Sequence, residues 1–216
     1  MPKQLEFKKV NGWGGKRRGA GRPNTTGLVS HGKRERVNFK KPLHITMRLE
    51  KGVANLRTRK IMWDFRRAIA GAKRFGFHVI HYSILNNHIH MIVEAKDSMA
   101  LASGMKSLSC RFAKAIRRIV GGSGRVFAGR FHHHLLNTPT EMKRALEYVL
   151  LNHAKHAKLI EHIDEFSSAA AFKEWNSLIG KKMNGFVQEQ LAHVGQIKEL
   201  SLPQSWLCSV GWIKAP

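Results

Sequence analysis

The sequence predicts an α+β fold: a mostly antiparallel sheet of four to five strands with helices on one face, followed by one further helix. Apolar, β-branched stretches of strand length alternate with longer stretches whose apolar residues recur at helical spacing. Two of the predicted strands, within Phe77–Ala95, are separated only by the polar turn at Asn86-Asn87. Asparagine tolerates positive φ, so this turn suits a tight hairpin.

The remaining elements follow from their apolar spacing and their boundary residues. Gly76 is expected to end the first helix, and Thr138-Pro139-Thr140-Glu141 is a capping box that begins the last one. Their order is strand, helix, strand, strand, helix, strand, helix, and the first six form the split βαβ arrangement of a ferredoxin-like fold. Besides the hairpin, the predicted elements are a strand over Leu43–Leu49, a helix from about Val53 to Phe75, a helix from about Met99 to Val120, a strand over Val126–Leu136 and a helix to about Lys158.

The charge of the chain indicates a polyanionic partner. Its 216 residues suffice for one catalytic domain with extensions, and its net charge is +24 with a pI near 10.8. Such a field favours nucleic acid. We expect three parts: a basic, Gly-rich and unfolded tail over 1–40, a folded domain over 41–158, and an extension over 159–216 that packs on this domain or contacts DNA.

The tail carries its own DNA-binding pattern. Gly21-Arg22-Pro23, preceded by Lys16-Arg17-Arg18, resembles an AT-hook, in which arginine enters a narrow minor groove. The alternative is a solvated basic tail whose affinity comes only from counterion release.

Other classes of protein fit the sequence poorly. No stretch has the ~18 apolar residues that span a bilayer, and the N-terminus has no secretory pattern. Cys110 and Cys208 match no zinc spacing, and Gly121–Gly124 lacks the ending of a nucleotide-binding loop. We therefore expect a cytoplasmic protein with reduced thiols.

The hairpin carries two histidines that could bind a metal. His88 and His90 are two residues apart on a predicted strand, so their imidazoles project from the same face, opposite Ile89, Met91 and Val93. Two imidazoles on a rigid strand are half of a metal site. Taken alone, they fit an ordinary polar strand face better than a metal site.

The last predicted helix offers the missing groups. Tyr148 and Asn152 are four residues apart, so on a continuous helix they share one face, away from the apolar positions. Beside the two histidines, Asn152 would supply a neutral oxygen ligand for Mg²⁺ or Mn²⁺, and Tyr148 a phenolic nucleophile for a phosphate. The alternative is a surface tyrosine beside a polar asparagine. Tyr82, the other tyrosine, is expected in the core, facing the same way as Ile80 and Ile84.

The cations and histidines around these groups are candidate DNA contacts. Arg144 or Lys155 could stabilise phenolate or phosphate charge. Of the three consecutive histidines in the fourth strand, at most His132 and His134 could act together, because strand side chains alternate. The predicted DNA-binding residues are Lys16, Arg17, Arg18, Arg22, Arg130, His132, Arg144 and Lys155.

These motifs together resemble HUH single-strand nucleases, specifically the single-tyrosine transposases associated with repetitive extragenic palindromes. The resemblance covers most of the chain and is carried by the first strand Pro42–Leu49, the strand Asn87–Glu94, the fourth-strand region Gly124–His132, the helix Glu147–Asn152, and the motifs Gly19–Pro23, Ser205–Leu207 and Gly211-Trp212. It implies that His88, His90 and Asn152 hold a divalent metal and that Tyr148 is the nucleophile. The implied activity is cleavage of single-stranded DNA near a hairpin, leaving a 5′-phosphotyrosine and a free 3′-OH that can reverse the reaction as strand transfer.

The sequence departs from the family pattern at two places, and two other functions are alternatives to cleavage. The turn reads Asn86-Asn87 where many relatives have Pro-Asn, and Leu151-Asn152-His153 stands where many have Asn-Pro. One alternative is a domesticated protein that holds hairpin DNA without cutting it. The other is a two-histidine phosphoesterase, since His44-Ile45-Thr46-Met47 resembles half of its repeat, although the second half is missing. The family analogy favours a monomer, with a dimer as the alternative.

Overall fold

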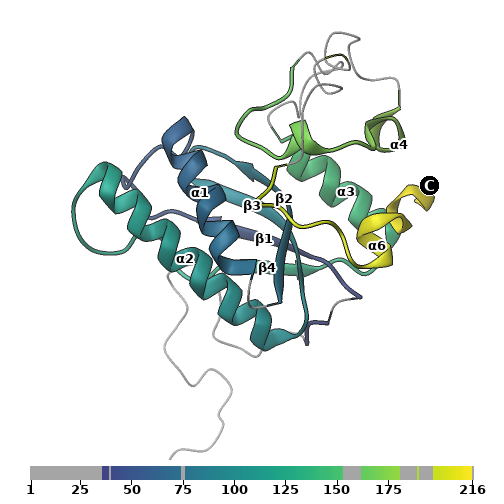
Figure 1. The fold of residues 1–216 in the computed structure, drawn as a ribbon, viewed down its shortest axis with the longest axis horizontal. Coiled ribbons are helices and arrows are strands. Elements are labelled where there is room, and N and C mark those ends of the chain that lie inside the picture. Colours follow the sequence, from purple (N-terminus) through teal and green to yellow (C-terminus); the bar gives the residue numbers. More distant parts are fainter. Residues whose placement is uncertain are drawn as a thin grey trace, which may run out of the picture.

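The computed structural model describes residues 36–38, 40–73, 76–152, 162–180, 189 and 197–215. Predictions that concern the N-terminal tail, Lys155, His153 or His156 lie outside these residues. Figure 1 shows the arrangement of the elements. They are, in chain order, β1 (Leu43–Arg48), α1 (Arg59–Ala72), β2 (Phe77–Ile84), β3 (His88–Ala95), α2 (Ser98–Val120), β4 (His132–Leu135), α3 (Pro139–Leu150), η2 (Ala169–Ala171), α4 (Trp175–Ile179), α6 (Trp206–Ser209) and η3 (Gly211–Lys214).

The four strands form one antiparallel sheet in the order β2-β3-β1-β4. β2 and β3 are joined by the expected hairpin, in which the N–H of Leu85 donates to the carbonyl of His88 (2.9 Å). β1 lies between β3 and β4, although β4 follows it by more than 80 residues in the chain. This topology confirms the predicted α+β class and the split βαβ order.

One face of the sheet is covered by α1 and α2, which lie side by side (Figure 1). Thr58 and Asp97 cap the two helices, each accepting a backbone N–H through its side chain. The two helices and this sheet face enclose a core in which Phe65, Phe77 and Phe112 are fully buried. This burial fixes which strand residues face inward, and therefore which face carries the histidines.

The start of α1 differs from the prediction. The helix begins at Arg59 and not near Val53, because Gly52 has positive φ (75°) and Thr58 provides the cap. Leu56 is buried as expected, but it precedes the helix: its N–H donates to the carbonyl of Asn86 (2.9 Å). The apolar residue Leu56 before Thr58 therefore reflects packing against the hairpin turn. It does not indicate a helix.

The opposite face of the sheet is covered by α3 and the C-terminal segments. Their core includes Ile92 of β3, Leu146 of α3 and the buried Trp212. A register shift between Val79 and His81 places Ile80 in this core, whereas Tyr82 and Ile84 lie in the α1–α2 core. Tyr82 is buried as predicted. Because of the bulge, however, its side chain and that of Ile80 point to opposite faces of the sheet, whereas the same face was expected.

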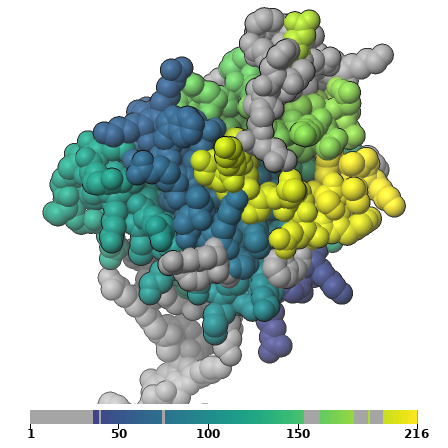
Figure 2. Space-filling model, in the orientation of Figure 1, coloured from purple at the N-terminus to yellow at the C-terminus, as the bar shows by residue number. Residues whose placement is uncertain are grey.

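The C-terminal residues are held against the sheet by a buried carboxylate. Glu94 of β3 accepts the backbone N–H groups of Gln204 (2.8 Å) and Ser205 (2.9 Å) and the hydroxyl of Ser205. Ser201 donates its N–H to the carbonyl of Val79 on the sheet-edge strand β2. Figure 2 shows this segment spread over the surface of the molecule. Trp206, in contrast, is 55% exposed.

Candidate active site

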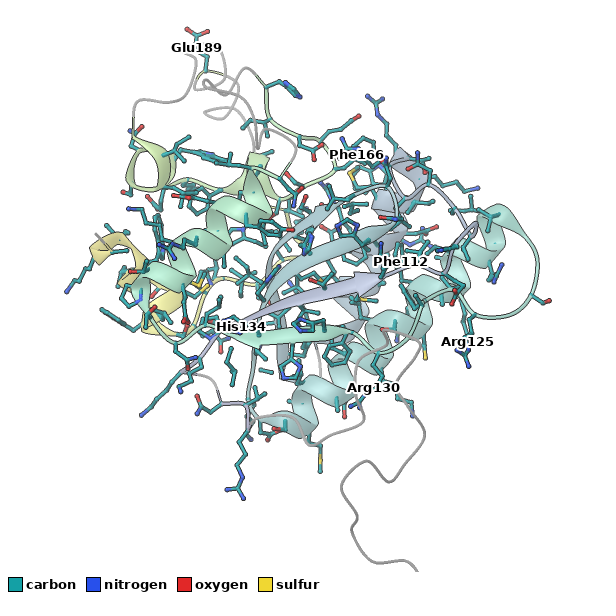
Figure 3. The ribbon with its side chains drawn as sticks, turned by 180° about the vertical axis from the view of Figure 1, so that it is seen from behind. Phe112, Arg125, Arg130, His134, Phe166 and Glu189 are labelled. Carbon is teal, nitrogen blue, oxygen red and sulfur yellow. The ribbon has the colours of Figure 1, made fainter. Side chains whose placement is uncertain are left out.

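The histidines gather on the sheet face that also packs against α3. Antiparallel pairing places Thr46 of β1 opposite His90, and Arg48 opposite His88. On its other side, β1 pairs Thr46 with His132 and His44 with His134. Because alternate residues share a face, these side chains form rows across β3, β1 and β4. Figure 3 shows His134 on the edge strand of this arrangement.

Helix α3 places Tyr148 against these rows. Thr138 caps the helix and Pro139 occupies its first turn, as predicted, and Leu146 and Val149 are buried against the sheet. Tyr148 lies off this apolar side and is 37% exposed. Its hydroxyl is 3.3 Å from Nε2 of His90, and the two ring centroids are 4.8 Å apart. The tyrosine helix therefore does lie beside the histidine pair.

His90 is held by contacts to two residues of β1. Its Nδ1 is 3.1 Å from Oγ1 of Thr46 and 3.1 Å from Nε2 of His44, and only 4% of His90 is exposed. When Nδ1 carries the proton, it can donate to Thr46 or His44, and the lone pair on Nε2 faces the Tyr148 hydroxyl. These contacts fix the orientation of the imidazole that lies nearest to the tyrosine.

Thr46 and His44 were not among the predicted site residues. A signal for them exists, because His44 and Thr46 have the same two-residue spacing on the first strand as His88 and His90 have on the third. What the sequence lacks is the register: only the pairing of Thr46 with His90 shows that the two pairs meet.

His88 is oriented by its own neighbour. Its Nδ1 is 2.7 Å from the side-chain oxygen of Asn87, so Nδ1 carries the proton and Nε2 keeps its lone pair. Burial, and then the Arg48 cation, lower the pKa of His88 from its usual 6.5. The rings of His88 and His90 lie 4.8 Å apart and almost perpendicular. His88 thus presents a neutral imidazole at pH 7.

His44 is also kept neutral. Burial, followed by the proximity of His134 and His132, lowers its pKa to about 4. Its ring stacks on His90 at 5.1 Å and meets Tyr148 edge-on at 5.6 Å. A neutral ring here avoids placing a buried positive charge against His90.

The donor set around His88 and His90 fits part of a divalent metal site. His88 presents a neutral imidazole whose Nδ1 is bonded to an amide oxygen, and Nδ1 of His90 lies beside a hydroxyl; both match the usual arrangement of a metal-binding histidine and its outer-shell partner. Among the described residues, no group of three or more His, Cys, Asp or Glu side chains could hold a metal ion.

Asn152 is positioned differently from the prediction. The last helix ends at Leu150 and does not continue to about Lys158 through Asn152, because Leu151 leaves the helical conformation (φ −109°, ψ 12°). Leu150 is buried and Leu151 packs against the same core. Consecutive residues point about 100° apart on a helix, so leaving the helix lets both leucines reach that core. Asn152 follows this turn and is half-buried, so it is not placed one helical turn beyond Tyr148.

The remaining predicted DNA contacts surround the site unevenly. Arg130 and His132 are exposed at the start of β4, and Arg144 is exposed on α3, one turn before Tyr148. Figure 3 shows Arg130 just before the edge strand. Of the C-terminal tryptophans, Trp212 is a core residue, whereas Trp206 is exposed and Nζ of Lys214 lies 5.7 Å from the centroid of its ring. In the part of the chain that the structure describes, no helix is long and apolar enough to cross a membrane.

Comparison with known proteins identifies the fold. No protein-family model matches the chain, and no curated protein matches it. Seven chains of solved structures do match, among them a REP-associated tyrosine transposase bound to a REP hairpin. That structure aligns with a TM-score of 0.52 at 21% sequence identity, over 65% of this chain and 82% of the transposase chain. The chain therefore has the fold of a REP-associated tyrosine transposase.

Proposed function

We propose that this protein is a metal-dependent single-strand DNA endonuclease and strand transferase that cleaves near DNA hairpins through Tyr148. One observation carries the proposal: the Tyr148 hydroxyl lies 3.3 Å from Nε2 of His90, whose ring lies 4.8 Å from the ring of His88. A phenol next to a potential metal site on a strongly basic protein is the arrangement that nucleophilic attack on a DNA phosphate requires. One solved structure with the same fold is a tyrosine transposase bound to a hairpin.

The reaction is a transesterification. The phenolic oxygen of Tyr148 attacks phosphorus and forms a P–O bond, while the bond between phosphorus and the 3′-oxygen breaks. The 3′-oxygen leaves and takes up a proton, giving a free 3′-OH and a 5′-phosphotyrosine. A 3′-OH then attacks the phosphotyrosine and releases Tyr148, which completes strand transfer. One phosphoester replaces another at each step, so no nucleotide cofactor is needed.

The residues around Tyr148 have separate roles in this scheme. His88 and His90 would hold Mg²⁺ or Mn²⁺ together with Asn152, and the bound ion would polarise the scissile phosphate. Thr46 and His44 keep the His90 ring in place. Proton loss from the phenol must accompany the attack. Nε2 of His90 is assigned to the metal in this scheme, so the phenolic proton passes to solvent water, which also supplies the proton that the 3′-oxygen takes up.

The surrounding charge favours a nucleic-acid substrate. Arg48 is exposed beside His88, and Arg130, His132 and Arg144 are exposed on nearby elements. Cations at these positions can bind phosphates on either side of the scissile bond. The proposed substrate is a DNA hairpin with a single-stranded flank. The protein would act on it as a monomer, with a dimer as the alternative.

The proposal is tested by trapping the covalent intermediate. Wild-type protein is incubated with a labelled hairpin oligonucleotide bearing single-stranded flanks and Mn²⁺ or Mg²⁺, and an SDS-resistant adduct is expected. Tyr148→Phe should abolish the adduct and leave hairpin binding nearly unchanged. The chain has only two tyrosines, so Tyr82→Phe is the matched control and should still form the adduct.

Two outcomes would change this conclusion. An adduct that persists in Tyr148→Phe would show that another residue is the nucleophile. The wild type could also bind hairpins tightly but form no adduct with either metal ion and any flank. That result would favour a hairpin-binding protein that does not cleave DNA.

A further inference from the structure

A short segment of the C-terminal extension, residues 163–168, follows the outer edge of β2, and we call it the edge strap. The N–H of Ile84 donates to the carbonyl of Phe166 (2.9 Å), and the N–H of Ser168 donates to the carbonyl of Tyr82 (2.9 Å). β2 is an edge strand of the sheet, so these bonds use backbone groups that point away from β3. Figure 3 shows Phe166 at this end of the sheet.

The edge strap is attached to both sides of the sheet. Ile163 packs against the core that contains α3, whereas Phe166 packs against the core between the sheet and the α1–α2 pair. Tyr148 lies on α3, and His88 begins β3 directly after the β2–β3 turn. The edge strap therefore contacts the elements that carry the two halves of the candidate active site.

One ion pair fastens the edge strap to the rest of the protein. Arg57, just before the cap of α1, donates from its two terminal nitrogens to the two carboxylate oxygens of Asp164, at 3.0 and 2.9 Å. Its guanidinium carbon also lies 4.5 Å from the centroid of the Phe166 ring. Only 20% of the Arg57 side chain and 5% of the Asp164 side chain are exposed. A bidentate pair in such a poorly solvated place fixes the orientation of both partners, unlike a surface ion pair.

The same arginine holds the start of the hairpin turn. Nη1 of Arg57 also donates to the carbonyl of Ile84, the last residue of β2 (3.1 Å). The N–H of the preceding residue, Leu56, donates to the carbonyl of Asn86 within the turn (2.9 Å). Two consecutive residues thus hold the turn, one at its beginning and one in its middle. The position of the next residue, Asn87, depends on the backbone that they hold.

We infer that Arg57 and Asp164 are positioning residues for His88: through the hairpin turn they set the contact between Asn87 and His88, and with it the metal affinity of the site. The inference rests on the proposed function, in which His88 holds the ion. The side-chain oxygen of Asn87 lies 2.7 Å from Nδ1 of His88. A hydrogen bond there keeps the proton on Nδ1 and the lone pair on Nε2, where a metal binds. The C-terminal extension thereby acts on a metal ligand that it does not touch.

The competing explanation is that the ion pair only stabilises the fold. A contact of that kind changes the fraction of unfolded molecules and leaves the properties of the folded ones as they are. The tautomer of the His88 ring and the affinity for Mn²⁺ are both properties of the folded protein. A change in these two quantities, in a variant that is still folded, therefore distinguishes positioning from stabilisation.

The test variant is Arg57→Met/Asp164→Asn. Removing one partner alone would leave a buried charge unpaired, whereas the double variant removes both charges and nearly keeps both shapes. Circular dichroism shows whether it is folded. Nitrogen-15 NMR of the ring nitrogens then gives the tautomer of His88 in metal-free protein, and the signal of His88 is assigned by its loss in His88→Ala. The electron paramagnetic resonance of free Mn²⁺ gives the dissociation constant of the ion.

In the wild type, the His88 ring should carry its proton on Nδ1. In the folded double variant the turn is released, so the ring should be a mixture of both tautomers. Mn²⁺ binding should weaken about three- to tenfold, less than the roughly 10- to 100-fold effect of a group bonded directly to a metal-binding histidine. A single Nδ1-protonated tautomer in the folded variant would overturn the inference, and so would an unaltered affinity for Mn²⁺.

A second variant decides the question if the double variant does not fold. Arg57→Lys keeps a positive charge beside Asp164, but one ammonium group cannot reproduce the planar fork that reaches Ile84 and both carboxylate oxygens. It should therefore also give a mixture of His88 tautomers. A wild-type spectrum for Arg57→Lys would show that charge alone is sufficient and that the inference is wrong.

A neighbouring ion pair provides the matched control. Nε of Arg59 lies 3.2 Å from a carboxylate oxygen of Glu165, so this pair joins the same two segments, but both side chains are more than half exposed. Arg59→Met/Glu165→Gln removes the same two charges and should leave the His88 tautomer and the Mn²⁺ affinity as in the wild type. An effect equal to that of the test variant would overturn the inference, because loosening the edge strap anywhere would then suffice.

Failure of this inference and failure of the proposed function give different results, because the tautomer is measured without metal or DNA. If Tyr148 forms the adduct but the His88 tautomer does not respond to Arg57→Met/Asp164→Asn, only the positioning role is wrong. If the tautomer responds but the wild type neither binds Mn²⁺ nor forms an adduct, the ion pair positions His88 and the proposed cleavage is wrong.

Discussion

The Thr46 hydroxyl lies 3.1 Å from Nδ1 of His90, so a residue of the first strand orients the imidazole that contacts Tyr148. The two residues are 44 positions apart in the chain and meet because β1 and β3 are adjacent in the sheet. This contact fixes which nitrogen of His90 faces the tyrosine. Groups that orient metal-binding histidines in this way typically change metal affinity or activity 10- to 100-fold, as order-of-magnitude values.

We therefore expect Thr46→Val to reduce adduct formation by about tenfold or more, with hairpin affinity unchanged. Valine keeps the shape of threonine but cannot accept the Nδ1 proton of His90. Thr46→Ser keeps the hydroxyl and should restore most of the activity. Rates of adduct formation at several Mn²⁺ concentrations provide the measurement. Equal rates for the valine and serine variants would show that Thr46 only fills space.

Metal removal should stop the reaction without unfolding the protein. EDTA should abolish adduct formation, and excess Mn²⁺ should restore it. His88→Ala should weaken Mn²⁺ binding, because it removes one of the two imidazoles that are proposed to hold the ion. The electron paramagnetic resonance signal of free Mn²⁺ measures this binding. His134→Ala, on the neighbouring row, is the control and should bind Mn²⁺ as the wild type does. Adduct formation that continues in EDTA would exclude the metal requirement.

The pH dependence of stability should include a contribution from His81. This residue is buried, its Nδ1 lies 3.2 Å from Oγ of Ser168, and desolvation lowers its pKa from 6.5 to about 4. The unfolded chain therefore binds a proton at His81 more readily than the folded protein does. The contribution of His81 to the free energy of unfolding is complete above pH 6.5. It is lost as the pH falls towards 4, and the total loss is about 3 kcal/mol.

His81→Gln should flatten this part of the stability profile between pH 6.5 and 4, measured by urea unfolding. His162→Gln, at an exposed position, should leave the profile as in the wild type. If the two variants give the same pH dependence, His81 is not the residue that titrates.

Glu94 should be essential for attaching the C-terminal segment. Its buried carboxylate accepts three hydrogen bonds from Gln204 and Ser205, and Ser205 in turn caps α6 by accepting the N–H of Cys208. Glu94→Ala would leave buried donors without partners and should lower the free energy of unfolding by about 3 kcal/mol. Proteolysis should then cut near residues 197–205 before the core is degraded.

Lys96→Ala, two residues further along the chain, is exposed and should change neither stability nor cleavage. Wild-type-like proteolysis of Glu94→Ala would mean that the other contacts of the segment, such as the Ser201–Val79 hydrogen bond and the apolar contacts of Trp212, are sufficient to hold it.

The sequence alone determined the elements whose signals are local. Alternating apolar residues defined β1 and the β2–β3 hairpin, and the Thr138–Glu141 capping box defined the start of α3. The direction of His88 and His90 followed from the two-residue period of a strand, and the off-core position of Tyr148 from the period of a helix. These properties depend on neighbouring residues, so they could be predicted.

The tertiary structure decided what depends on contacts between distant residues. Pairing of Thr46 with His90 added β1 to the candidate site, and the bulge after Val79 turned Ile80 away from Tyr82. The end of α3 at Leu150 moved Asn152 off the helical face that it was expected to share with Tyr148, since burying Leu150 and Leu151 together outweighs the local preference for helix. Register, bulges and helix ends are set by which side chains can be buried together, and that choice involves the whole fold.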